Sequence, residues 1–181
     1  MVDNPTGFAT TTVRIIKERL ADQLVEGIQY EKIDQWYEMT QFETDFEGWD
    51  DYLVPSQRLD GSTGSSLYDH VPFESNIERD FVAGLEHRND VKLYVKLPSW
   101  FTVPTPIGEY NPDWAIVMED RDEHGEATGK PLLYLVRETK STTNLDELRR
   151  EESRKIMCGR QHFKEALGVD YEVVVSAEYL P

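Results

Sequence analysis

Residues 111–140 read NPDWAIVMEDRDEHGEATGKPLLYLVRETK and contain two apolar, strand-like runs joined by a polar bridge. The first run begins after Pro112-Asp113, and the second ends in Glu138-Thr139-Lys140. Side chains alternate along a strand, so Glu138 and Lys140 point to one face and Thr139 to the other. If the two strands are antiparallel neighbours, Asp113 lies beside Glu138 and Lys140. Two carboxylates and an ammonium at one sheet edge suit a hard divalent cation and an activated water.

The residues around this stretch predict the order helix, three strands, helix, strand. Helical spacing and a capping box from Ser75 to Glu78 predict a helix over 75–88. Alternation and apolar runs predict strands, and a long apolar-striped helix follows the third strand, with Gly168 at its end. The predicted strands span 90–97, 110–118, 131–140 and 171–179, and the second long helix spans 145–166. In the strand over 110–118, Asp113, Ala115 and Val117 are expected on one face.

The segment before this core is expected to be an appendage. Residues 10–28 carry Val13, Ile16, Leu20 and Leu24 at helical spacing, a stripe that we expect to pack. Residues 43–51 form an acidic cluster that is expected to be a solvated loop, and 55–66 predict a flexible Gly/Ser-rich linker. The domain prediction is an N-terminal helical appendage and linker over 1–67 and a catalytic domain over 68–181. The chain has no evident domain start, which favours a piece of a longer protein.

Composition limits the classes that remain. One cysteine among 181 residues excludes a disulfide framework and fits a reducing cytoplasm, and there is neither a membrane-length apolar run nor a signal peptide. The net charge is −16, with 7 Lys and Arg against 19 Asp and Glu in residues 1–90, and 12 against 16 in residues 91–181. Free DNA-binding proteins usually have a basic face. We therefore expect that this chain does not capture DNA by itself.

The sequence resembles the PD-(D/E)xK nuclease superfamily through Pro112, Asp113, Glu138 and Lys140. The wider text, including KLPSWFTVPTPIGEYNPDWAIV and LYLVRETKST, is similar to the C-terminal nuclease part of the restriction (Res) subunit of type III restriction-modification enzymes. The resemblance implies an αβββαβ core, an α/β fold with a central mixed sheet flanked by helices. It also implies a Mg²⁺-dependent DNA endonuclease that acts with an ATP-driven helicase or translocase portion and a modification (methyltransferase) subunit. The ATP motor motifs are absent from this chain.

Site residues follow from the motif and the resemblance. Asp113 and Glu138 are expected to bind Mg²⁺, or Mn²⁺ in its place, with the Thr139 carbonyl as a further ligand. Lys140 is expected to position or deprotonate the attacking water and to stabilise the transition state. An acidic residue on the preceding helix often reaches the metal in this superfamily. Glu78 is the best candidate, beside its capping role, and Glu86 is the spare; Lys155, Arg160 and Gln161 are candidates for phosphate contact.

Several patterns have structural interpretations that we prefer. Asp90-Val91-Lys92 also reads D-x-K, but no Pro-Asp strand precedes it. Gly125, Gly129 and Lys130 have the wrong spacing for a phosphate loop. Cys158 and His162 lack further zinc ligands nearby, Trp100 and Phe101 are expected to pack on the core, and the basic residues of 145–166 could simply balance its acids.

Two other functions remain open at this point. The same fold could serve as a non-catalytic docking or DNA-contact module, with the acidic first half as its interface and no need for a metal. An unrelated metal-dependent hydrolase of small phosphate esters is the other alternative, and the lack of a phosphate-cradling loop counts against it.

Overall fold

A four-stranded mixed sheet forms the centre of the computed structural model, which describes residues 4–32, 56–58, 65–67, 70–122, 124–129 and 132–181. Its strand order is β3-β4-β5-β6, with antiparallel pairing among the first three strands and a parallel β5–β6 pair. The strands are β3 (Val91–Lys96), β4 (Trp114–Met118), β5 (Leu133–Thr139) and β6 (Asp170–Val174). A parallel neighbour needs a crossover connection, and a helix supplies it here.

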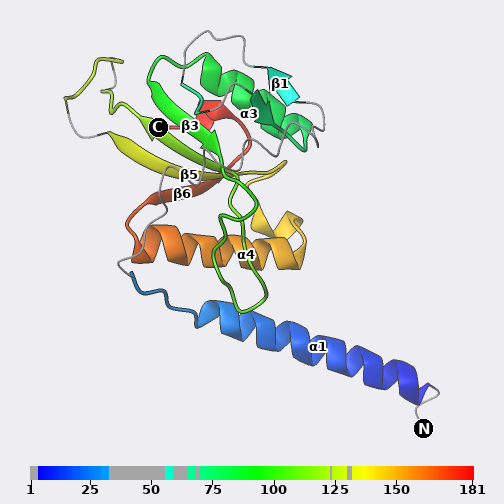
Figure 1. The fold of residues 1–181 in the computed structure, drawn as a ribbon. Helices are drawn as coiled ribbons and strands as arrows, with labels where there is room; N and C mark the ends of the chain where they lie inside the picture. The colour runs from blue at the N-terminus through cyan, green and yellow to red at the C-terminus, as the bar shows by residue number, and fades with distance from the viewer. Residues whose placement is uncertain (1–3, 33–55, 59–64, 68–69, 123, 130–131) are drawn as a thin grey trace.

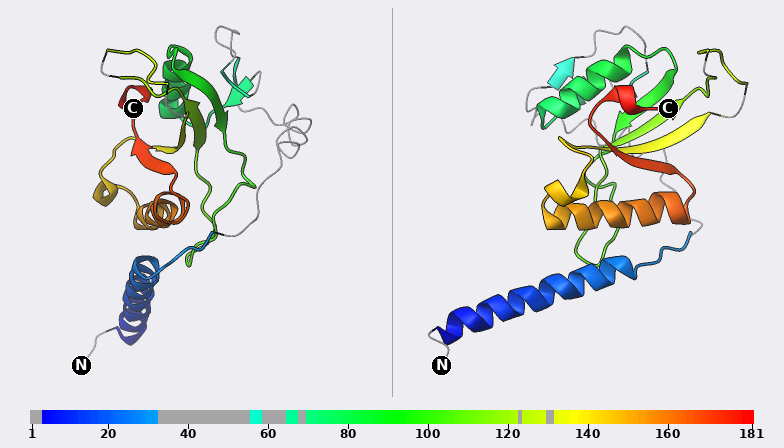
Figure 2. Two further views of the ribbon diagram at one scale, coloured as in Figure 1. Left: turned by 90° about the vertical axis from the view of Figure 1, so that its left-hand side faces the viewer. Right: turned by 180° about the vertical axis from the view of Figure 1, so that it is seen from behind.

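Two helices cover opposite faces of this sheet (Figures 1 and 2). α3 (Asn76–Glu86) precedes β3 on one face, and α4 (Arg150–Arg160) provides the crossover from β5 to β6 on the other. Short helical turns flank these elements, namely η2 (Leu145–Glu147), the π-helical η3 (Gln161–Ala166) and η4 (Ala177–Tyr179). The predicted order of helix, three strands, helix and strand is confirmed.

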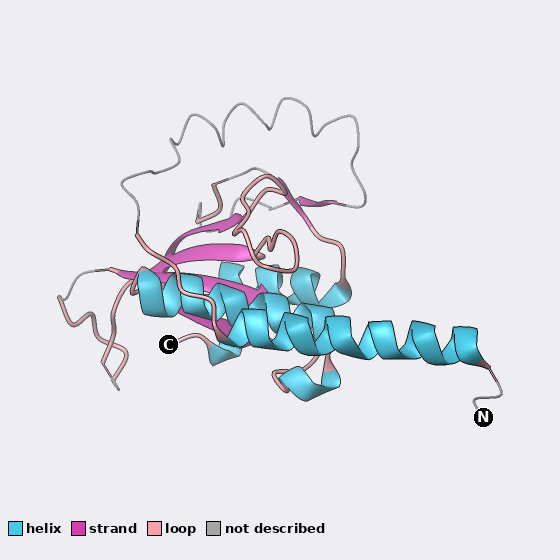
Figure 3. Ribbon diagram, turned by 90° about the horizontal axis from the view of Figure 1, so that it is seen from below, coloured by secondary structure: helices cyan, strands magenta, loops and turns pink. Residues whose placement is uncertain are grey.

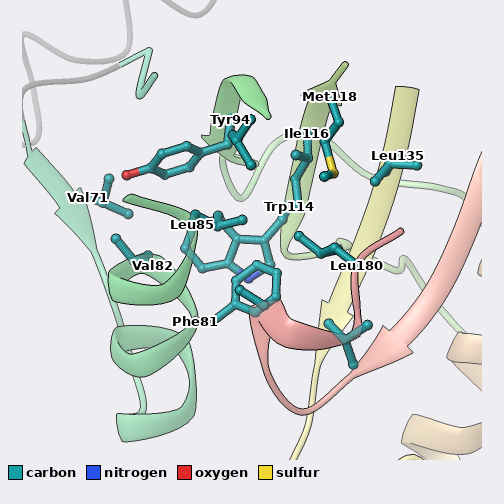
Figure 4. Close-up of a cluster of buried hydrophobic side chains, with 13 residues drawn as sticks. Val71, Phe81, Val82, Leu85, Tyr94, Trp114, Ile116, Met118, Leu135 and Leu180 are labelled. Atoms are coloured by element: carbon teal, nitrogen blue, oxygen red, sulfur yellow. The ribbon is translucent and has the colours of Figure 1, made fainter. Parts of the chain in front are cut away.

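The core on the α3 face is built around Trp114 (Figure 4). Phe81, Val82 and Leu85 of α3 pack toward this fully buried indole, with the Phe81 ring centroid 5.6 Å away. A buried aromatic side chain removes about 150–250 Å² from water and so dominates local packing. This packing fixes α3 on the sheet and thereby places Glu78, which lies one helical turn before Phe81.

A second core lies between the sheet and α4. Ile156 of α4 and Phe163 of η3 are buried against Val136 and Tyr171, and the Phe163 and Tyr171 rings stack at 5.6 Å. Phe101 packs at the margin of this core, as predicted. The two cores make β4 and β5 buried central strands, which agrees with their continuous apolar sequences.

Some boundaries differ from the sequence prediction. The strand predicted over 110–118 begins only at Trp114, because Tyr110 pairs with Val103 instead and Pro112 has no N–H for the ladder. The strand predicted over 171–179 ends at Val174, since the Ser176 hydroxyl accepts from the Glu178 N–H and starts η4. The helix predicted over 145–166 is divided into η2, α4 and η3.

Residues 56–58 do not belong to a structureless linker. They form β1 (Ser56–Arg58), which pairs antiparallel with β2 (His70–Pro72) in a separate two-stranded sheet. The linker prediction is therefore wrong at these three positions, where backbone pairing outweighs the composition of the surrounding segment. The predicted acidic cluster over 43–51 and Lys130 lie outside the described residues.

The first helix is longer than predicted and extends away from the rest of the chain (Figure 3). α1 (Pro5–Glu26) is capped by Asn4, whose side chain accepts from the Gly7 N–H. Its predicted packing stripe is exposed, with Ile16 at 59% and Leu20 at 53%. That packing prediction is wrong because α1 meets α4 through charged side chains, described below. Within the described part of the chain, no helix combines the length and apolarity that crossing a membrane requires.

Candidate active site

The register of β4 and β5 brings the two halves of the sequence signature together. Trp114 pairs with Arg137, so Asp113, just before Trp114, and Glu138, just after Arg137, meet at the same end of the sheet. Lys140 Nζ lies 2.7 Å from Glu138 Oε1. Asp113, Glu138 and Lys140 therefore come from neighbouring backbone positions, as expected from an antiparallel pair.

Glu138 is a buried carboxylate held by two neighbours, Lys140 and Tyr110. Besides Lys140, its Oε2 accepts a 2.6 Å hydrogen bond from the Tyr110 hydroxyl, which also lies 2.6 Å from the Tyr171 hydroxyl. Burial, with a further contribution from the charge of Asp113, raises the pKa of Glu138 to about 7, although Lys140 and Tyr110 act in the opposite direction. The site therefore carries more negative charge than its own lysine compensates.

Burial also lowers the pKa of Lys140, but the Glu138 and Asp113 carboxylates outweigh this and raise the pKa above its ordinary value. Lys140 is thus a protonated ammonium at neutral pH.

Asp113 is oriented by the end of β5 and by β3. Its Oδ2 accepts from the Thr139 N–H at 2.8 Å and the Thr139 hydroxyl at 2.7 Å, and its Oδ1 accepts from Lys96 Nζ at 3.1 Å. Thr139 Oγ1 also accepts from Trp114 Nε1 at 3.3 Å. Asp113 thus turns toward the face of Trp114. Its expected place beside Ala115 and Val117 is wrong, because β4 begins after it and alternation does not govern its direction.

Glu78 caps the start of α3 and also contacts Lys96. Its N–H donates to the Ser75 hydroxyl at 3.2 Å at the start of α3, while its Oε2 lies 3.0 Å from Lys96 Nζ. The Glu74 N–H also donates to that Oε2, at 3.1 Å. α3 therefore carries the acid to the site. Glu86, the spare candidate, instead accepts a hydrogen bond from the Tyr94 hydroxyl.

Sequence reasoning missed Lys96 and the tyrosine pair. Lys96 joins Glu78 to Asp113, and Tyr110 joins Glu138 to Tyr171. A signal for Lys96 was present, because an antiparallel β3–β4 pair places it directly opposite Trp114, next to Asp113. Tyr110 stands three residues before Asp113, but its direction depends on a loop that periodicity does not describe.

A cleft of about 280 Å³ opens beside Glu138 and Lys140. Lys155 of α4 is on its wall, whereas Arg160 and Gln161 are exposed at the end of that helix and are not among the described lining residues. The cleft is lined by Glu109, Tyr110, Asn111, Glu138, Lys140, Glu152, Lys155 and Ile156. Of the three predicted phosphate contacts, the structure thus brings one to the site.

Two arginines of α4 form ion pairs with acidic residues of α1. Arg154 contacts Asp22 at 2.6 Å and Arg150 contacts Glu18 at 3.1 Å. The prediction that the basic residues of this helix balance its own acids is therefore wrong at these two positions, since their partners are on another helix.

The residues of the sequence patterns that we interpreted as structural are paired or packed within the fold. Asp90 pairs with Arg88 at 2.7 Å, and Lys92 pairs with Glu119 at 3.3 Å. Cys158 is buried, and His162 packs edge-on against Tyr30 and Phe163.

The donor set fits Mg²⁺ in chemistry. Asp113, Glu138 and a backbone carbonyl are hard oxygen donors, and a ligand set this sparse suits an ion that keeps several of its waters. The incompletely compensated charge at Glu138 is the kind that a cation relieves. Among the described residues, no three His, Cys, Asp or Glu side chains converge into a metal-binding group. Glu78 and Asp113 are separated by the ammonium of Lys96.

A family model described as an endonuclease domain matches residues 64–178, which is more than half of the chain. The chain belongs to this endonuclease-domain family. Its four-stranded sheet flanked by helices is a restriction-endonuclease-like fold. No curated protein and no solved structure matches the chain.

Proposed function

We propose that this endonuclease domain hydrolyses DNA phosphodiester bonds with Mg²⁺, as the nuclease part of an ATP-dependent type III restriction enzyme. The observation that carries the proposal is the β4–β5 register, which sets Asp113 beside Glu138 and Lys140 in a chain of this family.

Asp113, Glu138 and the Thr139 carbonyl would hold Mg²⁺, with Mn²⁺ as a substitute and Glu78 contributing acidic charge from α3. When bound there, Mg²⁺ supplies a Lewis acid beside the scissile phosphate. The protein's part is orientation: Thr139 fixes Asp113 through two hydrogen bonds, and Tyr110 fixes Glu138 through one.

Lys140 acts as a protonated group in this proposal. Its raised pKa argues for donation to the attacking water and to the phosphate oxygens over removal of a proton. A compact ammonium aimed at developing negative charge stabilises the transition state without rearrangement.

DNA would enter along the cleft beside Glu138. Lys155 on the cleft wall would contact a backbone phosphate, and Arg160 and Gln161 would do so further along the duplex. Capture of the duplex is assigned to other parts of the enzyme, because the net charge of −16 opposes phosphate binding.

Those other parts are the helicase or translocase portion of the same subunit, which uses ATP, and the modification subunit, which reads the sequence. The support is the likeness of residues 96–117 and 133–142 to the nuclease part of type III Res subunits. Such an enzyme would act in the cytoplasm, in defence against phage DNA.

One observation favours the alternative of a non-catalytic docking module. The apolar stripe of α1 is exposed, as an interaction surface would be. A docking module has no requirement for a metal, so metal binding separates the two functions.

The test is calorimetric titration of Mn²⁺ and Mg²⁺ into the parent chain, Asp113→Ala and Glu138→Ala. Glu119→Ala is the matched control, because Glu119 is a carboxylate at the opposite end of β4. The proposal expects saturable binding in the parent and the control, lost in both site variants. If the metal titrations of all four proteins are the same, also with a short DNA duplex present, the result would favour the docking module.

Cleavage is tested in the complete enzyme. Asp113→Ala, Glu138→Ala and Lys140→Ala should each abolish cutting while ATP hydrolysis continues. Retained cutting in any of the three would remove that residue from the proposed mechanism.

A further inference from the structure

The Lys96 side chain lies between two carboxylates and an aromatic ring. Its side chain is 14% exposed, and its Nζ lies 3.0 Å from Glu78 Oε2 and 3.1 Å from Asp113 Oδ1. The same ammonium stands 4.9 Å from the centroid of the Trp114 ring. The three groups come from α3, from the residue before β4 and from β4 itself, and Lys96 is in β3. The packing of α3, β3 and β4 therefore fixes the position of the charge.

This ammonium already has two carboxylate partners and an aromatic neighbour. An ammonium has three N–H donors, and here two carboxylates and one ring face surround it. Two carboxylate oxygens within 3.1 Å of Nζ favour the charged form of this side chain. Lys96 therefore acts on its two carboxylates and through them on the site.

The two carboxylates share one cation position, that of the Lys96 ammonium. Glu78 reaches it from α3, and the Asp113 oxygen that faces it, Oδ1, is not the one that Thr139 binds. Carboxylates that share a cation between them, one of them also beside a second acid such as Glu138, are the arrangement found around paired metal ions in phosphodiester-cleaving sites. In this chain the protein's own ammonium fills one of the two positions.

We propose that Lys96 takes the place of a second divalent ion, so that Glu78 is committed to an ammonium and the domain accommodates one metal ion and not two. This deepens the proposed function and rests on it for the first ion, at Asp113 and Glu138. The physical reason is charge: a divalent ion at Glu78 would lie within a few ångströms of a fixed positive charge in a partly buried site, where repulsion is strong. Lys96 is thus a positioning residue for Asp113 and a permanent counter-ion for Glu78.

The test counts bound ions. Mn²⁺ is titrated into the parent chain and Lys96→Met, with binding followed by calorimetry and by the loss of the free Mn²⁺ electron paramagnetic resonance signal. Methionine keeps an unbranched apolar chain over Trp114 and removes the charge. The expected result is that Lys96→Met binds one Mn²⁺ ion more per chain than the parent does. Equal counts in the two proteins would overturn the proposal.

Three further variants isolate the cause. Lys92→Met removes a lysine of the same strand that pairs with the partly exposed Glu119, and should leave the count unchanged. Lys96→Arg keeps the positive charge and should add no ion. Glu78→Gln combined with Lys96→Met should return the count to the parental value. An added ion in either of the first two variants, or one that persists in the double variant, would contradict the role given to Lys96.

Folding is monitored in parallel, because Lys96→Met leaves two carboxylates without their ammonium. If the metal-free variant is unfolded by circular dichroism, Mn²⁺ should restore the fold, and failure to restore it would overturn the proposal. The difference between variant and parent tests Lys96, whereas the absolute count in the parent tests the proposed function. A parent that binds no ion and a Lys96→Met protein that binds one would refute the metal-dependent nuclease and keep the inference on Lys96.

Discussion

Glu138 shows how much of this site depends on single hydrogen bonds. Its two oxygens are divided between a cation and a phenol, Oε1 facing Lys140 and Oε2 accepting from Tyr110. Only 4% of the residue is exposed, so the carboxylate depends on these two partners. The E-x-K pattern predicted the Lys140 contact because side chains two apart on a strand share a face. The Tyr110 contact was not predictable, since it arises from a loop residue.

Removing the Tyr110 hydroxyl should therefore destabilise the domain. Tyr110→Phe leaves Glu138 Oε2 and the Tyr171 hydroxyl without a shared partner, and an unsatisfied buried polar group costs about 1–3 kcal/mol. Urea unfolding should show this loss. Tyr134→Phe is the control, because Tyr134 is 63% exposed on β5 and should unfold like the parent. Identical midpoints for all three proteins would show that the buried hydroxyl contributes nothing.

Glu138 should also give the metal-free domain an unusual pH dependence. Its carboxyl has a pKa of 4.5 when unfolded and about 7 when folded, so between these values the folded state binds more protons. Stability then falls as pH rises from about 4.5 to about 7, by an amount on the order of 3 kcal/mol. Glu138→Gln should lack this fall.

The measurement is chemical denaturation in chelator-containing buffer at a series of pH values. Burial lowers the pKa of His162, which contributes a slope of the opposite sign in both proteins, so the difference between parent and Glu138→Gln isolates the carboxyl. A difference that stays constant from pH 4.5 to 7 would contradict the raised pKa.

At the scale of elements, periodicity and capping predicted the features that the local sequence controls, such as the start and the buried face of a helix. Ser75 caps α3 and its apolar face is buried, both as expected from spacing. The failures occur where tertiary pairing decides. β4 starts late because Tyr110 pairs with Val103, and α1 presents its apolar stripe to the outside because α4 offers arginines to Glu18 and Asp22. The spacing of apolar residues in the sequence does not reveal these tertiary contacts.

The helix α4 contributes to the site through Gly159, because the absence of a side chain there leaves room for Tyr110. A Cβ at Gly159 would lie 2.5 Å from Tyr110 Cε1, which is closer than carbon atoms approach, and 3.2 Å from Tyr171 Cζ, which is a tight contact. Gly159→Ala should push Tyr110 away from Glu138 and destabilise the domain by about 1–3 kcal/mol from overpacking, against a gain of up to about 1 kcal/mol in helix propensity.

Gly84→Ala provides the comparison, because its Cβ would lie 2.7 Å from Ala177 Cβ, on the other face of the sheet. Both variants should unfold at lower urea concentration, measured by circular dichroism. Only Gly159→Ala should also weaken Mn²⁺ binding in the calorimeter. Equal metal affinities in the two glycine variants would show that α4 supports the fold without orienting Glu138.

At the scale of the whole molecule, the signature residues were predictable as a group, but their division between two faces was not. Asp113 and Glu78 share Lys96 on the α3 face, whereas Glu138 and Lys140 border the cleft on the α4 face. The sequence indicated the sheet edge where these residues meet, because strand ends fix it. The direction of each carboxylate depended on Lys96, Thr139 and Tyr110, whose contacts exist only once three elements have packed.

The charge of the whole chain leads to a prediction about DNA. With a net charge of −16, and with Arg150 and Arg154 engaged by α1, the isolated chain should show no saturable binding to a labelled duplex by fluorescence anisotropy at physiological ionic strength. The complete enzyme serves as the positive control on the same duplex. Saturable binding by the isolated chain, weakening steeply with added salt, would contradict this expectation. It would show that basic residues such as Lys155 form a DNA-binding surface strong enough to overcome the acidic remainder.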